Sequence, residues 1–317
     1  MKVNHIYCGN SLEILKSFPN KSIDCCVTSP PYYALRNYNK CGQIGIEKTP
    51  NKYIEKLLDI FAQVHRVLKD DGTLWLNLGD TYSYISRGSG GHKTKSMIQL
   101  KNIGSYYDIK HIYNVDLKSE NLKSKDLMGI PWTVALNLRD KLGFYLRQDI
   151  IWAKPNPMPE SVKDRCTKSH EYIFLLSKSK KYYFDSDSIK EKAKEESKNR
   201  YNFKFNTGIK EVIGSGRLNA KSNSMGFKKF TGFRNKRDVW IVSPKGYKGA
   251  HFATFPTELI KPCILAGCPE NGIVLDPFFG SGTVGVVAKQ LNRIYIGIDI
   301  NENYCKLAKQ RIENGGN

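Results

Sequence analysis

The sequence predicts an α/β fold built from βαβ units, and three stretches of the chain indicate it. A strand pattern at residues 2–7 is followed by a short helical pattern at 11–18 and a buried strand at 23–28. Residues 53–68 carry apolar side chains at helical spacing and precede a strand at 73–78. The C-terminal part repeats the alternation, with helices expected at 256–266, 283–291 and 302–312 and strands at 273–275 and 295–298.

The middle of the chain continues this pattern between two segments of different composition. Pro131 opens a predicted helix at 130–142, and strands are expected at 145–152 and 172–177, with 180–184 as a possible hairpin partner. Residues 81–126 are rich in Gly, Ser and Lys, which is typical of a long mobile loop. Residues 186–237 form a basic insert. The core is therefore expected to comprise 1–185 and 238–317.

The charge distribution favours a nucleic-acid partner. The 317 residues contain 50 Lys and Arg against 30 Asp and Glu, and the formal net charge is +20. Fourteen of the basic residues and only five acidic ones fall between 186 and 237. No apolar run is long enough for a membrane span or a signal peptide. We expect a cytoplasmic protein, monomeric or homodimeric, that does not bind a membrane.

Metal binding has no support in the sequence. None of the eight cysteines pairs at the two-residue spacing of a zinc knuckle, so reduced thiols are the simpler interpretation. The six histidines lack the i, i+4 arrangement with Glu of a zinc hydrolase helix. We expect no structural metal.

A glycine-rich turn near the C-terminus indicates a nucleoside site. Asp276-Pro277-Phe278-Phe279-Gly280-Ser281-Gly282-Thr283 joins a predicted strand to a helix, where glycines let the backbone approach a ligand. The turn lacks the Gly-Lys-Ser/Thr ending of a phosphate loop and the third glycine of a dinucleotide site. Asp299 ends the next strand and can accept hydrogen bonds from ribose hydroxyls. The pattern fits adenosine without pyrophosphate. A plain turn with a helix cap at Asp299 is the structural alternative.

A second turn near the N-terminus can hold a planar amine. Ser29-Pro30-Pro31-Tyr32 follows a buried strand, and the two prolines restrict the backbone and present Tyr32 as a rigid flat face. A flipped base can stack on Tyr32 while its amino group donates to the Ser29 hydroxyl and the Pro30 carbonyl. A polyproline turn without function, or a peptide-binding proline motif, is the alternative.

These motifs in this order resemble the amino-methylating DNA methyltransferases with permuted (beta-class) motif order. The resemblance spans most of the chain, and each motif alone is weak. The segments that carry it are Thr28-Ser29-Pro30-Pro31-Tyr32, Thr73-Leu74-Trp75-Leu76-Asn77-Leu78-Gly79-Asp80, Trp152-Ala153-Lys154-Pro155-Asn156-Pro157, His251-Phe252-Ala253-Thr254-Phe255-Pro256 and Asp276-Pro277-Phe278-Phe279-Gly280-Ser281-Gly282-Thr283.

The resemblance implies a fold and a cofactor. It implies a Rossmann-like, seven-stranded mixed sheet in which strand 2–7 lies beside 295–298, and strand 23–28 beside 273–275. It implies S-adenosyl-L-methionine bound above Phe278 and Gly280. By the same likeness Thr254, Phe255 and Pro256 line the cofactor pocket. Asn10 stands where relatives often carry Asp near the adenine amino group, and its amide can donate as well as accept.

The implied reaction is direct transfer of the sulfonium methyl group to an exocyclic nitrogen, without a covalent enzyme intermediate. Cytosine N4 and adenine N6 present the same amine. In the family, Ser before Pro-Pro-Tyr is more common in cytosine-N4 enzymes, so cytosine is preferred here and adenine-N6 methylation is the first alternative. A non-catalytic nucleic-acid-binding protein and a dinucleotide oxidoreductase are more remote alternatives.

The basic insert is the predicted target-recognition region. Its cations intermingle with aromatic residues, which suits contacts with double-stranded DNA, although a merely solvated Lys-rich face is the alternative. A cognate restriction endonuclease is a possible partner. The DNA-binding candidates are Lys228, Lys229, Arg234, Lys236 and Arg237.

Overall fold

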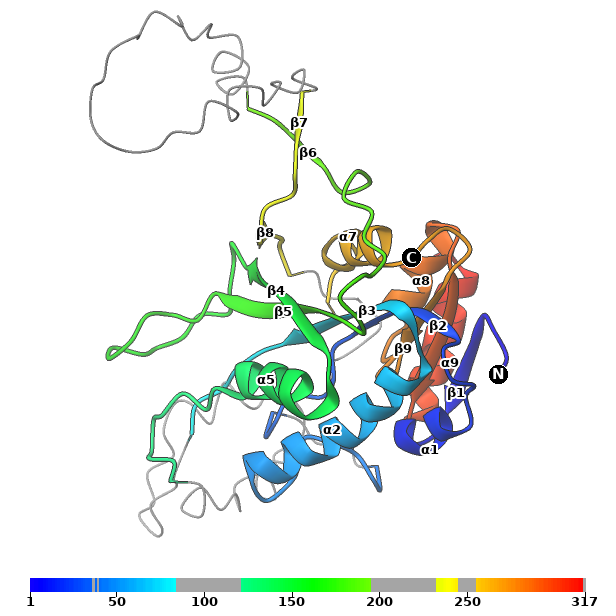
Figure 1. Cartoon of the computed structure of the whole chain (residues 1–317). Coiled ribbons are helices and arrows are strands. Elements are labelled where there is room, and N and C mark those ends of the chain that lie inside the picture. The colour runs from blue at the N-terminus through cyan, green and yellow to red at the C-terminus, as the bar shows by residue number, and fades with distance from the viewer. Residues whose placement is uncertain (36–37, 39, 84–120, 195–231, 245–254, 316–317) are drawn as a thin grey trace, which may run out of the picture. The chain divides into compact units, whose positions relative to one another are not determined.

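The chain divides into a large and a small unit. The computed structural model describes residues 1–317 except 36–37, 39, 84–120, 195–231, 245–254 and 316–317. The large unit comprises 1–185 and 238–317, and the small unit comprises 186–237 (Figure 1). In the small unit, β6 (Glu191–Lys192) pairs antiparallel with β7 (Phe233–Arg234). The role of the small unit stays a prediction.

A mixed sheet forms the centre of the large unit. Its spatial order is β1-β10-β9-β2-β3-β5-β4-β8, and all neighbouring pairs are parallel except those that involve β5. The strands are β1 (His5–Cys8), β2 (Ile23–Thr28), β3 (Leu68–Leu78), β4 (Tyr145–Ala153), β5 (His170–Ser177), β8 (Val239–Ile241), β9 (Ile273–Asp276) and β10 (Ile294–Asp299).

The sheet has one strand more than the seven expected. The additional strand is β8, which pairs with β4 through Trp240 opposite Trp152. Only the middle one of its three residues is buried, which is too short a pattern to predict a strand. The hairpin partner expected at 180–184 is wrong, because that segment has no strand. It makes single backbone bonds instead, such as Tyr183 N to the Asp71 carbonyl at 2.9 Å.

Helices cover both faces of this sheet. They are α1 (Ser11–Lys16), α2 (Pro50–Val67), α5 (Ile130–Leu142), α7 (Thr257–Gly267), α8 (Thr283–Gln290) and α9 (Glu302–Glu313) (Figure 1). Neighbouring residues of β2 show how the faces differ, because successive side chains of a strand point to opposite sides. Cys26 belongs to the apolar cluster that includes the buried face of α2, whereas the Cys25 sulfur lies beside Gly267 of α7.

The strand order reverses between β2 and β9. Cys25 and Cys26 of β2 pair with Val274 and Leu275 of β9, although these strands lie at opposite ends of the sequence. In open α/β sheets, ligands bind beyond the carboxyl ends of the strands at such a reversal. The Ser-Pro-Pro-Tyr turn follows β2 and the glycine-rich turn follows β9, so both predicted sites lie at this edge.

Candidate functional site

One cavity of about 260 Å³ receives side chains from both predicted sites. The N-terminal turn lines it with Ser29 and Tyr32, and the C-terminal turn lines it with Phe278 and Gly280. The structure therefore brings together residues separated by about 250 positions in the chain. The predicted site residues that line this cavity are Asn10, Ser29, Pro30, Pro31, Tyr32, Phe255, Pro277, Phe278, Gly280, Ser281, Thr283 and Asp299.

Asp276 connects the Ser-Pro-Pro-Tyr turn with the glycine-rich turn through hydrogen bonds on either side. Its Oδ1 accepts a hydrogen bond from Thr28 Oγ1 at 2.6 Å and from the Phe278 N–H at 3.0 Å. The side chain is buried and does not line the cavity. Burial disfavours the carboxylate and raises the pKa of Asp276 to about 7, against the opposing effect of the two hydrogen bonds. Asp276 thus holds the end of β2 to the turn after β9.

Gly282 also has a structural role and does not line the cavity. Its φ is +78°, a left-handed conformation that favours glycine, and a Cβ there would lie 2.7 Å from the Ala308 Cβ on α9. The glycine therefore lets α9 pack against the start of α8. Pro256 is buried at the N-cap of α7, next to Phe255, and does not line the cavity either.

Asp299 keeps acceptor capacity for hydroxyl groups. Its Oδ2 accepts the Gly280 N–H at 2.7 Å and its Oδ1 accepts the Asn301 N–H at 2.8 Å. Burial raises the pKa of Asp299, and these two backbone bonds oppose that rise. Each carboxylate oxygen has two lone-pair directions, so one direction on each oxygen remains after the backbone bonds. The pair suits a cis-diol such as that of ribose.

Asn10 can only donate toward a ligand. Its Oδ1 caps α1 by accepting the N–H groups of Leu12 at 2.9 Å and Glu13 at 3.3 Å. Because the oxygen is used in this way, the Nδ2 group is the part of the amide that can face a nucleobase. The sequence left both possibilities open, and the helix cap decides between them.

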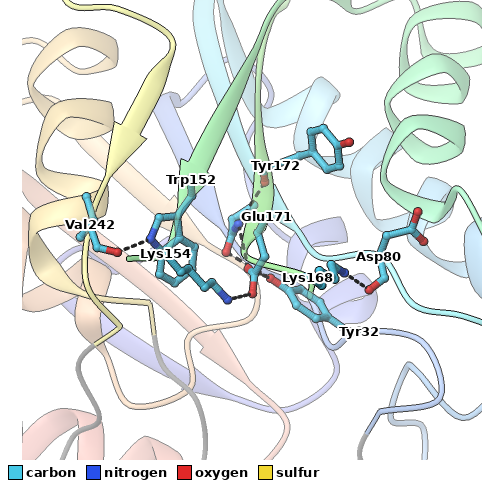
Figure 2. A network of polar contacts seen from close by, with 9 residues as sticks. Tyr32, Asp80, Trp152, Lys154, Lys168, Glu171, Tyr172 and Val242 are labelled. Carbon is cyan, nitrogen blue, oxygen red and sulfur yellow. Dashed lines mark hydrogen bonds and ion pairs between the residues drawn. The ribbon is translucent and has the colours of Figure 1, made fainter. Parts of the chain in front are cut away.

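Tyr32 lines the part of the cavity beside β3 and β5, which the sheet order separates from Asp299 on β10, and an acidic partner fixes it there. Its hydroxyl donates to Glu171 Oε2 at 2.5 Å and lies 3.2 Å from Asn77 Oδ1 (Figure 2). The pKa of Tyr32 is well above its usual value because the phenol is buried, and the charge of Glu171 raises it further. A hydrogen bond with Ser29 has the opposite effect. Tyr32 therefore remains a protonated donor.

Sequence reasoning did not identify four residues that line this end of the cavity. Two of these side chains, Lys154 and Glu171, form an ion pair, and Lys154 Nζ lies 4.4 Å from the centre of the Trp152 ring. Three of the four occur in segments that carried the family resemblance, so a signal was present, but Glu171 lies inside a strand without any motif. The four are Asn77, Trp152, Lys154 and Glu171.

The remaining predicted residues either belong to the small unit or fall outside the described part of the chain. Thr254, Lys228 and Lys229 fall in segments that the structure does not describe. Within the small unit, Glu191 faces Arg234 Nη2 and Lys236 Nζ, both at 3.3 Å, and Arg237 Nε at 3.8 Å. One carboxylate of the small unit thus contacts three cations.

The described residues contain neither a metal-binding cluster nor a membrane-spanning helix. Among them, no group of three or more His, Cys, Asp or Glu side chains is arranged to hold a metal ion. No helix in the described ranges has the length and apolar character that a membrane span needs.

Comparison with protein families shows which family this chain belongs to. Residues 23–310 match the family model of the N6 and N4 enzymes, which is described as DNA methylase. The chain belongs to this family. It is a DNA methyltransferase that uses S-adenosyl-L-methionine and methylates an exocyclic amino group.

Relatives of this DNA methyltransferase match it over most of their length. Type II methyltransferase M.Cfr9I of Citrobacter freundii is 43% identical over 305 residues, which is 96% of this chain and 86% of the relative. Type II methyltransferase M.SmaI of Serratia marcescens is 44% identical over 307 residues, which is 97% of this chain and 90% of the relative.

Solved structures share the fold. The PvuII DNA methyltransferase, which is cytosine-N4-specific, superposes with a TM-score of 0.62 at 19% identity and covers 98% of this chain and 92% of its own. A DNA modification methylase of Thermus thermophilus, in complex with S-adenosyl-L-methionine, gives a TM-score of 0.58 at 22% identity and covers 98% and 93%. The Rossmann-like α/β fold expected from the sequence is confirmed.

Proposed function

We propose that this methyltransferase modifies the N4 amino group of a cytosine that is flipped out of double-stranded DNA. The observation that carries the proposal is the cavity shared by the Ser29–Tyr32 turn and the turn around Gly280. A base that enters beside Tyr32 meets a cofactor held at the other end. The Ser that precedes Pro-Pro-Tyr supports cytosine over adenine by the family resemblance.

The described residues fit the cofactor. Asp299 would accept hydrogen bonds from the ribose hydroxyls, since each of its oxygens retains a lone-pair direction. Asn10 would donate to a ring nitrogen of the adenine. Phe278 offers an apolar face, and Gly280 carries no side chain that would keep the ligand from the backbone. Bound S-adenosylmethionine supplies an electrophilic methyl group on its sulfonium sulfur.

The Ser29 hydroxyl would act on the target amine as an acceptor. Tyr32 gives its one proton to Glu171, so Ser29 is the donor in its hydrogen bond with Tyr32. The lone pairs of Ser29 are thereby available to the amino group of the base. Together with the Pro30 carbonyl they would favour a pyramidal nitrogen whose own lone pair points at the methyl group. A serine hydroxyl is too weak a base to deprotonate the amine before methyl transfer. The amine would therefore lose its proton to water after the transfer.

The small unit would bind the DNA backbone. Residues 186–237 contain fourteen basic and five acidic residues, with Arg234, Lys236 and Arg237 among the basic ones, which suits contact with phosphate. Lys228 and Lys229 belong to the same basic insert. If these cations neutralise phosphates, DNA affinity should fall by orders of magnitude between low and moderate salt. A complex that is insensitive to salt would contradict this role.

The biological setting that we propose is a type II restriction–modification system with a cognate endonuclease. The type II relatives support this setting. The decisive test is the product. DNA methylated by the purified protein is digested to nucleosides, and mass spectrometry should detect N4-methylcytosine. N6-methyladenine as the sole product would establish the alternative specificity.

A further inference from the structure

The target end of the cavity contains a charged pair whose role the proposed chemistry leaves open. The side chains of Lys154 and Glu171 are only 20% and 14% exposed, and both line the cavity. Lys154 follows the end of β4, and Glu171 is the second residue of β5, so adjacent strands present the pair together. A largely buried ion pair seldom adds much to stability, since desolvation offsets the attraction between the charges. Stability alone therefore does not account for this pair.

Lys154 is held in place by more than its charge. Glu171 Oε1 accepts one of its three N–H groups, and the ammonium lies 4.4 Å from the centre of the Trp152 ring, a cation–π arrangement. Trp152 is fixed in turn because its Nε1 donates to the Val242 carbonyl at 2.8 Å (Figure 2). Lysine side chains are usually flexible, but Lys154 thus has a defined position. Its ammonium group has three N–H donors, of which the bond to Glu171 uses one.

Glu171 connects the Lys154 ammonium group to Tyr32, the residue on which the target base is predicted to stack. Its second oxygen accepts the Tyr32 hydroxyl at 2.5 Å and lies 3.3 Å from Asn77 Nδ2. One carboxylate therefore bridges Lys154 and Tyr32, and it sets the position of the Lys154 ammonium group relative to the Tyr32 ring (Figure 2). Glu171 is a positioning residue for both side chains.

Cytosine and adenine differ at the place that such a donor would contact. Both bases carry an amino group and, next to it, a ring nitrogen that accepts hydrogen bonds. Beyond that nitrogen, cytosine has the carbonyl oxygen O2, whereas adenine has only a C–H group. If Ser29 holds the amino group of the base, the O2 atom of cytosine, or the corresponding C–H group of adenine, would point further into the site, toward Lys154. A site built to hydrogen-bond a substrate atom rejects analogues that lack it, because its own polar group is left unpaired.

We propose that Lys154 is a specificity-determining residue whose ammonium group, held by Glu171 and the Trp152 ring, donates a hydrogen bond to O2 of the target cytosine. This inference rests on the proposed N4-methylation of cytosine. In this proposal the Lys154–Glu171 pair selects the base, whereas Ser29 and the Pro30 carbonyl act on its amino group.

The test compares product ratios. Duplexes that carry cytosine or adenine at the target position are methylated separately, and kcat/KM is measured for each base by mass spectrometry. The variant Lys154→Met, Glu171→Gln removes the donor without leaving an unpaired charge and keeps an acceptor for Tyr32. We expect its cytosine-to-adenine preference to fall by about 10- to 100-fold, the value of one hydrogen bond to a charged group. Lys154→Gln, which keeps a neutral donor, should retain part of the preference.

Lys168→Met is the matched control. Lys168 belongs to the same polar region, but it donates to the Asp80 carbonyl and does not line the cavity (Figure 2). Its loss should leave the cytosine-to-adenine ratio unchanged. The inference is overturned if the ratio stays constant in both Lys154 variants while turnover falls, since Lys154 would then only maintain structure. Should the wild type methylate adenine alone in its own recognition site, the proposed function itself fails, which is a different result.

Discussion

Gly79 offers a way to displace Tyr32 without altering any polar group. A Cβ on Gly79 would lie 2.7 Å from Cε2 of Tyr32, and 3.2 and 3.3 Å from Cδ2 and Cζ. Carbon atoms in comfortable contact are about 3.5 Å apart, so Gly79→Ala must move the ring by roughly 0.8 Å. The ring cannot swing freely, because its hydroxyl is bound to Glu171 and its backbone follows two prolines.

The expected effect is on turnover and not on cofactor affinity. A misplacement of about 1 Å at a reacting geometry lowers rates by up to about 100-fold, so we expect single-turnover methyl transfer to slow by about 10- to 100-fold. The affinity for S-adenosylmethionine, measured by calorimetry, should be unchanged, since Tyr32 lies at the opposite end of the cavity. Overpacking should also lower stability by about 1–3 kcal/mol.

Gly143→Ala is the control for loss of stability alone. Gly143 has φ +75°, and a Cβ there meets nothing within 4 Å, so the added methyl group strains only the backbone. It should cost about 1 kcal/mol of stability and leave the transfer rate intact. A wild-type rate in Gly79→Ala, or a cofactor affinity that falls as much as the rate, would refute the placement of Tyr32 against the target base.

Three more predictions concern Asp299, which lines the cavity, and Asp276 and Gly282, which lie in the neighbouring glycine-rich turn. Asp299→Ala should weaken cofactor binding by about tenfold or more in calorimetry, because it removes a half-buried acceptor for the ribose hydroxyls. The folded-state pKa of Asp276 is raised to about 7, so the carboxylate is disfavoured in the folded protein and stability is lost as pH rises from about 4 to 7. In urea unfolding, the free energy of unfolding of the wild type should fall by on the order of 4 kcal/mol relative to that of Asp276→Asn between about pH 4 and pH 7. Gly282→Ala should lower the free energy of unfolding by about 1–3 kcal/mol, because its Cβ collides with Ala308.

Each of these outcomes has a clear opposite. Unchanged cofactor affinity in Asp299→Ala would remove that residue from the binding site. A stability difference between wild type and Asp276→Asn that stays constant from about pH 4 to 8 would show that the carboxyl is not buried as described. A Gly282→Ala variant of wild-type stability would contradict the close approach of α9.

The sequence predicted the arrangement of the two motif turns, because parallel strands place their carboxyl ends at one edge. The resemblance gave the neighbours correctly: β2 lies beside β9, and β1 lies beside β10. Roles set by packing were not predictable. Nothing in the sequence shows that Gly282 faces Ala308, or that the oxygen of Asn10 is used to cap α1.

The Glu171 network shows the limit most clearly. Asn77 lies on β3, Lys154 follows β4 and Glu171 lies on β5, so the group forms only when three strands pair in the correct register. Alternating strand patterns indicate which side of the sheet a residue faces, but they do not identify its partner on the next strand. β8 escaped prediction for a related reason, since a three-residue edge strand has almost no periodicity.

The central claim is that the Ser29 turn and the glycine turn act on one methyl transfer within one cavity. The most direct test follows a labelled methyl group from S-adenosylmethionine to duplex DNA in a single turnover, for wild type and Ser29→Ala. We predict labelled N4-methylcytosine from the wild type, and from Ser29→Ala equal cofactor affinity with transfer slowed by at least about tenfold. An undiminished rate in Ser29→Ala, or a loss of cofactor binding that matches the loss of rate, would contradict the account.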